Sequence, residues 1–290
     1  MTKPLLLKNL RLLGAAKTDV LIQNGRIARI APELTPTGDV TVEDCGDALA
    51  LPGLIDAHAH LDKTLWGMPW HPHQQGKSLQ QMIDTERHLR HELDMDAERQ
   101  SSRQVALALS KGTTAIRSHV DIDTDHGLSL FEGVAATRER YADVMQIEIV
   151  AFPQSGMMIR PGTVELMDQA LRDGAEFVGG LDPCGIDRDP KGQLDAVFGL
   201  AEKHGKQIDI HLHEPGEMGA FSLEMILDRT EALAMQGKVT VSHAFCLGMN
   251  DQARVSGLLD RIAALDVSLA TTAPASRPVP SVAACRERGI

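Results

Sequence analysis

His58 and His60 stand two residues apart, directly after an apolar run that covers residues 51–57. On a β-strand, side chains two positions apart point to the same side. Imidazole is a ligand for zinc and iron(II), and chelation needs two or three such groups in one place. We therefore expect a buried strand that delivers both imidazoles to a metal at its carboxyl end.

Other polar side chains follow later apolar stretches at matching positions. They are Gln154, His211, Glu214 and His243. Parallel strands of a β/α barrel bring their carboxyl ends to one rim, where the sites of such barrels lie. Each residue alone could be an ordinary hydrogen-bonding group of that rim, but together they favour a metal site.

The residue types suggest a division of roles. His58, His60 and His211 would hold the metal as neutral imidazoles, and a metal with an open position lowers the pKa of water. Glu214, three residues after His211, could take the proton of the water and pass it to the leaving group. His243 could polarise the electrophilic carbon or orient the hydroxide.

Gln154 presents both an amide donor and an amide acceptor, which suits the N3/O2 edge of a pyrimidine. His213 competes with His211 as a ligand, because the two share a strand face if the strand continues. The roles of His119, Asp121 and Asp182 stay open between supporting the pocket and ordinary hydrogen bonding at the rim.

The elements that would position these groups repeat as helix, glycine, apolar strand and polar strand end. Seven strands are predicted, at residues 53–58, 113–119, 145–152, 177–181, 207–211, 239–243 and 267–270. Helices are predicted at residues 78–93, 96–111, 128–141, 163–173, 193–204, 221–236, 251–265 and 281–288. This alternation predicts an α/β fold, a (β/α)8 TIM barrel. We expect the barrel to be truncated before its eighth strand, which would begin near Ile290.

Residues 1–50 differ from the rest because they hold short strand-like runs without helices. Asn24-Gly25 between two such runs is a strong hairpin signal. We expect a small β-sandwich domain at 1–50, incomplete without strands from the C-terminal side, and a barrel domain at 51–290.

The composition limits the partners. The net charge is −11 with both signs interspersed, which argues against nucleic acid or an anionic membrane. The four cysteines are scattered, and the N-terminus lacks the features of a signal peptide. We expect a cytoplasmic protein that binds a small molecule, and a homo-oligomer would be compatible with such a surface.

Five stretches together resemble the amidohydrolase superfamily, and within it the bacterial cytosine deaminase group, which includes N-isopropylammelide aminohydrolases. The stretches are LPGLIDAHAHLDK at 51–63, IRSHVD at 116–121, FPQ at 152–154, IDIHLHE at 208–214 and SHAF at 242–245. Strand four ends in Gly180-Leu181-Asp182 without a lysine for a carbamate bridge, which is similar to the mononuclear deaminases. The last ligand of the family, an aspartate after strand eight, would lie beyond residue 290.

The resemblance implies one divalent metal, Zn²⁺ or Fe²⁺, held by His58, His60 and His211. It implies Glu214 as proton shuttle, His243 at the hydroxide or substrate, and Gln154 as reader of the pyrimidine. The expected reaction is hydrolytic deamination of an exocyclic amine on a nitrogen heterocycle, with cytosine first. The alternatives are an s-triazine N-alkylammelide aminohydrolase, a cyclic amidohydrolase and a non-catalytic remnant.

Overall fold

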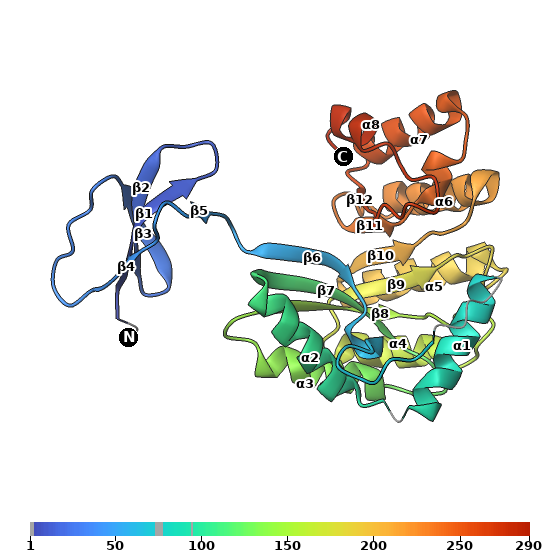
Figure 1. Cartoon of the computed structure of the whole chain (residues 1–290). Helices are drawn as coiled ribbons and strands as arrows, with labels where there is room; N and C mark the ends of the chain where they lie inside the picture. The colour runs from blue at the N-terminus through green and yellow to red at the C-terminus, as the bar shows by residue number, and fades with distance from the viewer. Residues whose placement is uncertain (1–2, 73–77, 94) are drawn as a thin grey trace. The chain divides into compact units, whose positions relative to one another are not determined.

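The computed structural model describes residues 3–72, 78–93 and 95–290. The chain divides into two compact units, Met1–Gly53 and Leu54–Ile290 (Figure 1). The first unit is a small sheet, and the second carries the predicted site residues.

The N-terminal unit is one mixed sheet in the order β3-β2-β1-β4, with β5 beside β1. Its strands are β1 (Leu5–Leu12), β2 (Lys17–Gln23), β3 (Arg26–Ala31), β4 (Thr41–Asp44) and β5 (Leu49–Ala50). Asn24 and Gly25 join β2 to β3 with φ values of 52° and 72°. Positive φ at both turn residues fits the two-residue hairpin that the sequence predicts, and the antiparallel pairing confirms it. A second sheet, which a sandwich requires, stays a prediction.

The second unit contains seven parallel strands that pair in chain order. They are β6 (Leu54–Ala59), β7 (Thr113–Asp121), β8 (Gln146–Phe152), β9 (Phe177–Leu181), β10 (Gln207–His211), β11 (Val239–Ser242) and β12 (Ser268–Ala270). Sequential parallel pairing requires a crossover after each strand, and helices supply the crossovers on the outside of the curved sheet (Figure 1). The predicted α/β barrel fold is confirmed.

The helices begin and end where local chemistry favours it. They are α1 (Leu79–Glu92), α2 (Ala97–Ser110), α3 (Ser129–Arg140), α4 (Thr163–Arg172), α5 (Pro190–His204), α6 (Gly216–Ala232), α7 (Gln252–Ala264) and α8 (Val282–Glu287), with 3₁₀ turns η1 (Leu61–Lys63) and η2 (Phe245–Gly248). The side chains of Ser78 and Asp96 accept N-cap hydrogen bonds at the starts of α1 and α2. Helix α5 begins three residues before the predicted start, because Asp189 caps it and Pro190 occupies its first turn.

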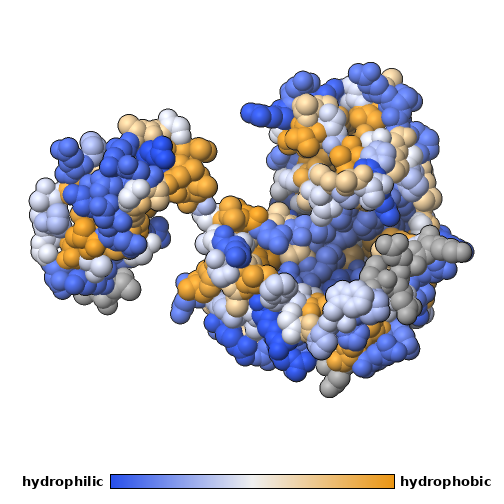
Figure 2. Space-filling model, in the orientation of Figure 1, coloured by the Kyte–Doolittle hydropathy of each residue, from blue (hydrophilic) through white to orange (hydrophobic). Residues whose placement is uncertain are grey.

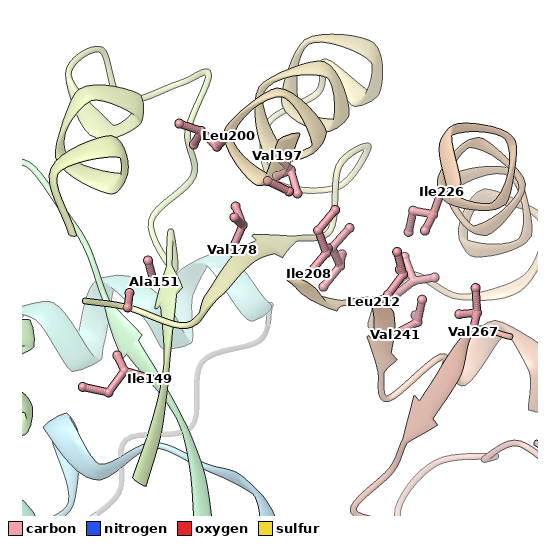
Figure 3. Packing of buried hydrophobic residues seen from close by; sticks show 14 of the residues in the cluster. Ile149, Ala151, Val178, Val197, Leu200, Ile208, Leu212, Ile226, Val241 and Val267 are labelled. Atoms are coloured by element: carbon pink, nitrogen blue, oxygen red, sulfur yellow. The ribbon is translucent and has the colours of Figure 1, made fainter. Parts of the chain in front are cut away.

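The core of this unit lies between the strands and the helices. Figure 3 shows Val178 and Ile208 on adjacent strands facing Val197 of α5, and Val241 near Ile226 of α6. The strands that carry the site are therefore fixed from behind by packed aliphatic side chains.

One expectation about the first barrel strand was wrong. The sequence predicted a buried strand, but Leu54 is 53% exposed and Ile55 is 73% exposed. The reason is that β6 is an edge of the seven-stranded sheet and pairs with β7 along one side. Only its carboxyl end is sheltered, and Ala59 there is buried.

Among residues 3–72, 78–93 and 95–290, no helix has the length and apolar character needed to cross a membrane.

Candidate metal centre

Four imidazoles from three strands meet at the carboxyl ends of the barrel strands. His58 and His60 come from β6 and the residue just after it, His119 from β7, and His211 from the end of β10. One ring nitrogen of each lies within 4.8 Å of one from each other histidine. The Nε2 atoms of His60 and His211 are 3.4 Å apart. Two ligands of one tetrahedral zinc, each at about 2.05 Å, lie about 3.3 Å apart, so this spacing fits a divalent ion.

His119 is the member of this cluster whose role the sequence left open. Its signal was the same as that of His58, a histidine at the end of an apolar strand, but the strand continues two residues further to Asp121. His213, the competing ligand in the sequence, lies outside the group of four. Its Nδ1 instead lies 2.9 Å from Oδ2 of Asp182.

The surroundings of His58, His60 and His211 keep these three rings neutral. Burial, with help from neighbouring His119, lowers the pKa of His58 to about 4. Burial also lowers the pKa values of His60 and His211 well below the usual 6.5. A neutral imidazole has a free lone pair, so His58, His60 and His211 can bind a metal near pH 7.

A buried carboxylate lies beside the cluster. Oδ1 of Asp209 accepts a 2.7 Å hydrogen bond from the Ser242 hydroxyl and lies 3.3 Å from Nε2 of His119. Its Oδ2 is 3.3 Å from Nη1 of Arg117. Burial raises the pKa of Asp209, but His119, Ser242 and Arg117 more than offset this and the pKa lies below its usual value. Asp209 is therefore a fixed negative charge two residues before His211.

A cavity of about 450 Å³ adjoins the cluster, which is enough room for a single-ring substrate. Its lining includes His58, His60 and His211 of the cluster together with Lys63, Glu86, Gln154, Leu181, His213 and His243. The barrel unit is hollowed on the face shown in Figure 2, where hydrophilic residues gather. Polar groups thus surround the space that a ligand of the metal would occupy.

Gln154 lies in this wall, as the sequence placed it, and its Nε2 donates a 2.6 Å hydrogen bond to Glu86. Lys63, which sequence reasoning missed as a site residue, also lines the cavity. Its Nζ lies 3.1 Å from Asp121 and 3.4 Å from Glu86. The only hint in the sequence was its place just after the histidine pair. Asp121, left open above, also pairs with Arg90.

His243 follows β11 and also lines the cavity. Its φ of 72° and that of Ala244, 44°, end the strand one residue before the predicted end and turn the chain at the rim. The ring stacks on His213 with centroids 4.4 Å apart. Burial, together with His213, lowers the pKa of His243 to about 3, so this ring is a neutral donor or acceptor.

The carboxylate of Glu214 accepts three hydrogen bonds. Its Oε1 accepts from the backbone N–H groups of Cys184 and Gly185, both at 2.7 Å, and Oε2 accepts from the Ser222 hydroxyl. Burial raises its pKa above the usual value despite these bonds. The structure thus brings His58, His60, His211, Gln154 and His243 to one cavity. The carboxylate of Glu214 is bonded to Cys184 and Gly185 instead and is not part of the cavity lining.

Several known proteins are similar to this chain in sequence and in fold. A solved N-isopropylammelide isopropylaminohydrolase from Burkholderia multivorans is 48% identical, with a TM-score of 0.96, over 100% of this chain and 73% of that one. A 5-methylcytosine deaminase from Klebsiella pneumoniae is 25% identical, with a TM-score of 0.82, over 98% of this chain and 73% of that one.

The curated relatives are longer than this chain. Uncharacterized protein YahJ of Escherichia coli K12 is 35% identical over 89% of this chain, and this chain spans 57% of its length. The N-isopropylammelide isopropyl amidohydrolase of Pseudomonas sp. strain ADP is 29% identical, over 79% of this chain and 57% of its own length. The model of the Amidohydrolase family matches residues 41–290. This chain belongs to the amidohydrolase family.

Proposed function

We propose that the chain forms the metal centre and substrate pocket of a hydrolase that replaces an exocyclic amino or alkylamino group of a nitrogen heterocycle with oxygen, releasing the amine. The observation that carries this proposal is the histidine cluster opening into a cavity lined by Lys63 and Gln154. The family membership supports hydrolysis, and the relatives above support a heterocyclic ring.

His58, His60 and His211 would hold one divalent ion, zinc or iron(II), with His119 beside them. Such an ion, when bound, supplies Lewis acidity and lowers the pKa of water. The three proposed ligands contribute neutral nitrogens, as their lowered pKa values require.

Proton transfer is assigned to Glu214, with His243 orienting the reacting groups. The raised pKa of Glu214, caused by burial, suits a carboxyl that must hold a proton and release it to an amine. To reach the cavity, Glu214 must exchange its bonds to Cys184, Gly185 and Ser222 for bonds to the substrate side. Asp182 holds His213 against His243 and so keeps that ring in place.

The lining favours a ring rich in carbonyl oxygens. Gln154 can donate to and accept from an amide-like ring edge, and the ammonium of Lys63 can donate to an oxygen or pair with an anionic ring. Together with the 48% identity to an N-isopropylammelide isopropylaminohydrolase, this favours an N-alkylammelide as substrate. Cytosine, the first expectation from the sequence, becomes the second candidate, supported by the 25% identical 5-methylcytosine deaminase.

The test is amine release by the purified protein after loading with zinc or iron(II). N-isopropylammelide and cytosine should be supplied separately, with isopropylamine, ammonia and the ring product measured. We expect isopropylamine from the first compound and none from a His60→Ala variant. Absence of amine from both rings would contradict the proposal, and an opened ring would indicate cyclic amide hydrolysis instead.

A further inference from the structure

Ser242 lies at the end of β11, fully buried, and its hydroxyl oxygen has two polar neighbours. It is 2.7 Å from Oδ1 of Asp209 and 3.2 Å from Nδ1 of His58. Parallel pairing of β10 and β11 puts Ser242 beside His211. His58 lies on β6, at the far edge of the same sheet from β12 and β11, so its contact with Ser242 joins strands that are not paired with each other. The serine therefore connects a buried carboxylate to one of the proposed metal ligands.

Counting hydrogens fixes the direction of both bonds. A serine hydroxyl has one hydrogen to donate, and an ionised carboxylate can only accept. Nε2 of His119 lies 3.3 Å from Oδ1 of Asp209 and Nη1 of Arg117 lies 3.3 Å from Oδ2, and these contacts keep the carboxyl ionised. The hydroxyl must therefore donate to Asp209, and the hydrogen in its contact with His58 must come from the imidazole.

We propose that Asp209 and Ser242 act as positioning residues that set the tautomer of His58, with the proton on Nδ1 and the lone pair on Nε2. This inference rests on the metal site of the proposed function, and it assigns the donor atom of one ligand before any ion arrives. A carboxylate–hydroxyl–imidazole chain of this kind fixes both the tautomer and the orientation of the ring.

The other two proposed ligands lack such a chain. Nδ1 of His60 and Nδ1 of His211 are buried and have no hydrogen-bond partner among the residues that the structure describes. Their Nε2 atoms face each other at 3.4 Å. Of the three proposed ligands, His58 is therefore the one whose Nδ1 is bonded to another described residue. We expect its ring to have the best-defined orientation when no metal is bound.

The direct test is a long-range ¹H–¹⁵N correlation spectrum of the full chain, labelled with ¹⁵N-histidine and stripped of metal. The His58 signals are assigned by their loss in a His58→Gln variant. We expect a protonated Nδ1 and a bare Nε2 in the wild type, and a mixture of tautomers in Ser242→Ala. Zinc affinity, measured by competition with a chromophoric chelator, should fall about 10-fold to 100-fold in that variant.

The matched control is Ser101→Ala, which removes another fully buried serine hydroxyl, bonded to Thr137 at 2.6 Å and outside the cavity lining. It should change neither the tautomer nor the zinc affinity. If Ser242→Ala does not fold, Ser242→Cys and Asp209→Asn replace it, because both keep the shape and weaken the chain of hydrogen bonds.

A wild-type His58 protonated on Nε2 would overturn the inference. So would a Ser242→Ala protein with an unchanged tautomer and a zinc affinity within twofold of the wild type. The expected tautomer in a protein that releases no amine from any ring would support the inference while contradicting the proposed function. The two failures are therefore distinguishable.

Discussion

At the scale of residues, the site depends on imidazoles that burial keeps neutral. The pKa of His58 is lowered to about 4 and that of His243 to about 3, in each case chiefly by burial. The carboxylate of Asp209 acts in the opposite direction and raises both pKa values, but burial outweighs it. The same burial that makes these rings poor bases leaves their lone pairs free for a metal or a substrate.

The structure places Lys63 in the lining of the cavity, where the sequence assigned it no role. We predict that Lys63→Met raises KM for an N-alkylammelide by about 10-fold or more, because the variant loses a charged donor to the ring. The kcat value should change less, since Lys63 is not among the proposed metal ligands. Steady-state kinetics of amine release measures both constants.

The control for this prediction is Lys191→Met, which removes an ammonium that is paired with Asp195 on the surface of α5. Its kinetics should match the wild type. An unchanged KM in Lys63→Met would remove Lys63 from the proposed pocket, and a loss confined to kcat would assign it to the chemistry instead.

Among the elements, short segments after the strands carry proposed site residues, and His243 on one of them lines the cavity. Asp182 after β9 and His243 after β11 both have positive φ, 37° and 72°. The turn after β10 carries Glu214 and leads at once into α6. Helix α6 packs against the backbone of Glu214, so a substitution in this helix can test whether that packing supports the site.

Gly219 in α6 provides such a test. A Cβ at this position would lie 2.1 Å from the backbone oxygen of Glu214 and 2.7 Å from Cβ of Cys246. We predict that Gly219→Ala lowers the free energy of unfolding by about 2 kcal/mol or more, because the helix must move off the turn. Urea denaturation followed by circular dichroism measures this change.

The matched control is Gly199→Ala in α5, where a Cβ would meet nothing within 4 Å. Alanine there should stabilise the protein by about 0.5–1 kcal/mol, since it favours the helix. Equal effects of the two substitutions would show that α6 is not packed against the Glu214 turn as described.

Much of this arrangement was predictable because local chemistry determines it. The Asn24-Gly25 turn, the capping residue Ser78 and the strand ending at His211 were each specified by a few neighbouring residues. The contacts of Glu214 and the place of His119 were not, because both depend on which elements lie opposite after folding. The exposure of β6 also escaped prediction, since an apolar run gives no information about its neighbours.

At the scale of the whole molecule, the buried histidines couple stability to pH. The unfolded chain titrates its histidines near 6.5, whereas the folded chain holds the pKa of His58 at about 4. Between these values the unfolded state binds more protons, so acid favours unfolding. Burial, with help from Asp121, raises the pKa of Asp62 to about 6. The folded state therefore binds a proton at Asp62 more readily than the unfolded state does, which favours folding in acid. The buried histidines with lowered pKa values outnumber this one carboxyl, so acid still favours unfolding.

We predict that the free energy of unfolding of the metal-free protein falls as the pH is lowered from about 6.5 toward 4. Urea titrations at pH 7.5, 6 and 5 measure it, and the fall should be shallower in a His211→Asn variant. Stability that is constant from pH 7.5 to 5 would mean that these rings are not buried in solution.

His58, His60 and His211 come from distant parts of the chain, and we propose that they bind one ion. Metal content per chain, measured by inductively coupled plasma mass spectrometry after zinc loading and gel filtration, tests it most directly. We predict about one zinc in the wild type and in the control His204→Ala, whose histidine pairs with Asp168 on the helical side of the barrel. His60→Ala and His211→Ala, with circular dichroism spectra like the wild type, should each retain less than about a tenth of this amount. A full equivalent of zinc in both variants would contradict the account.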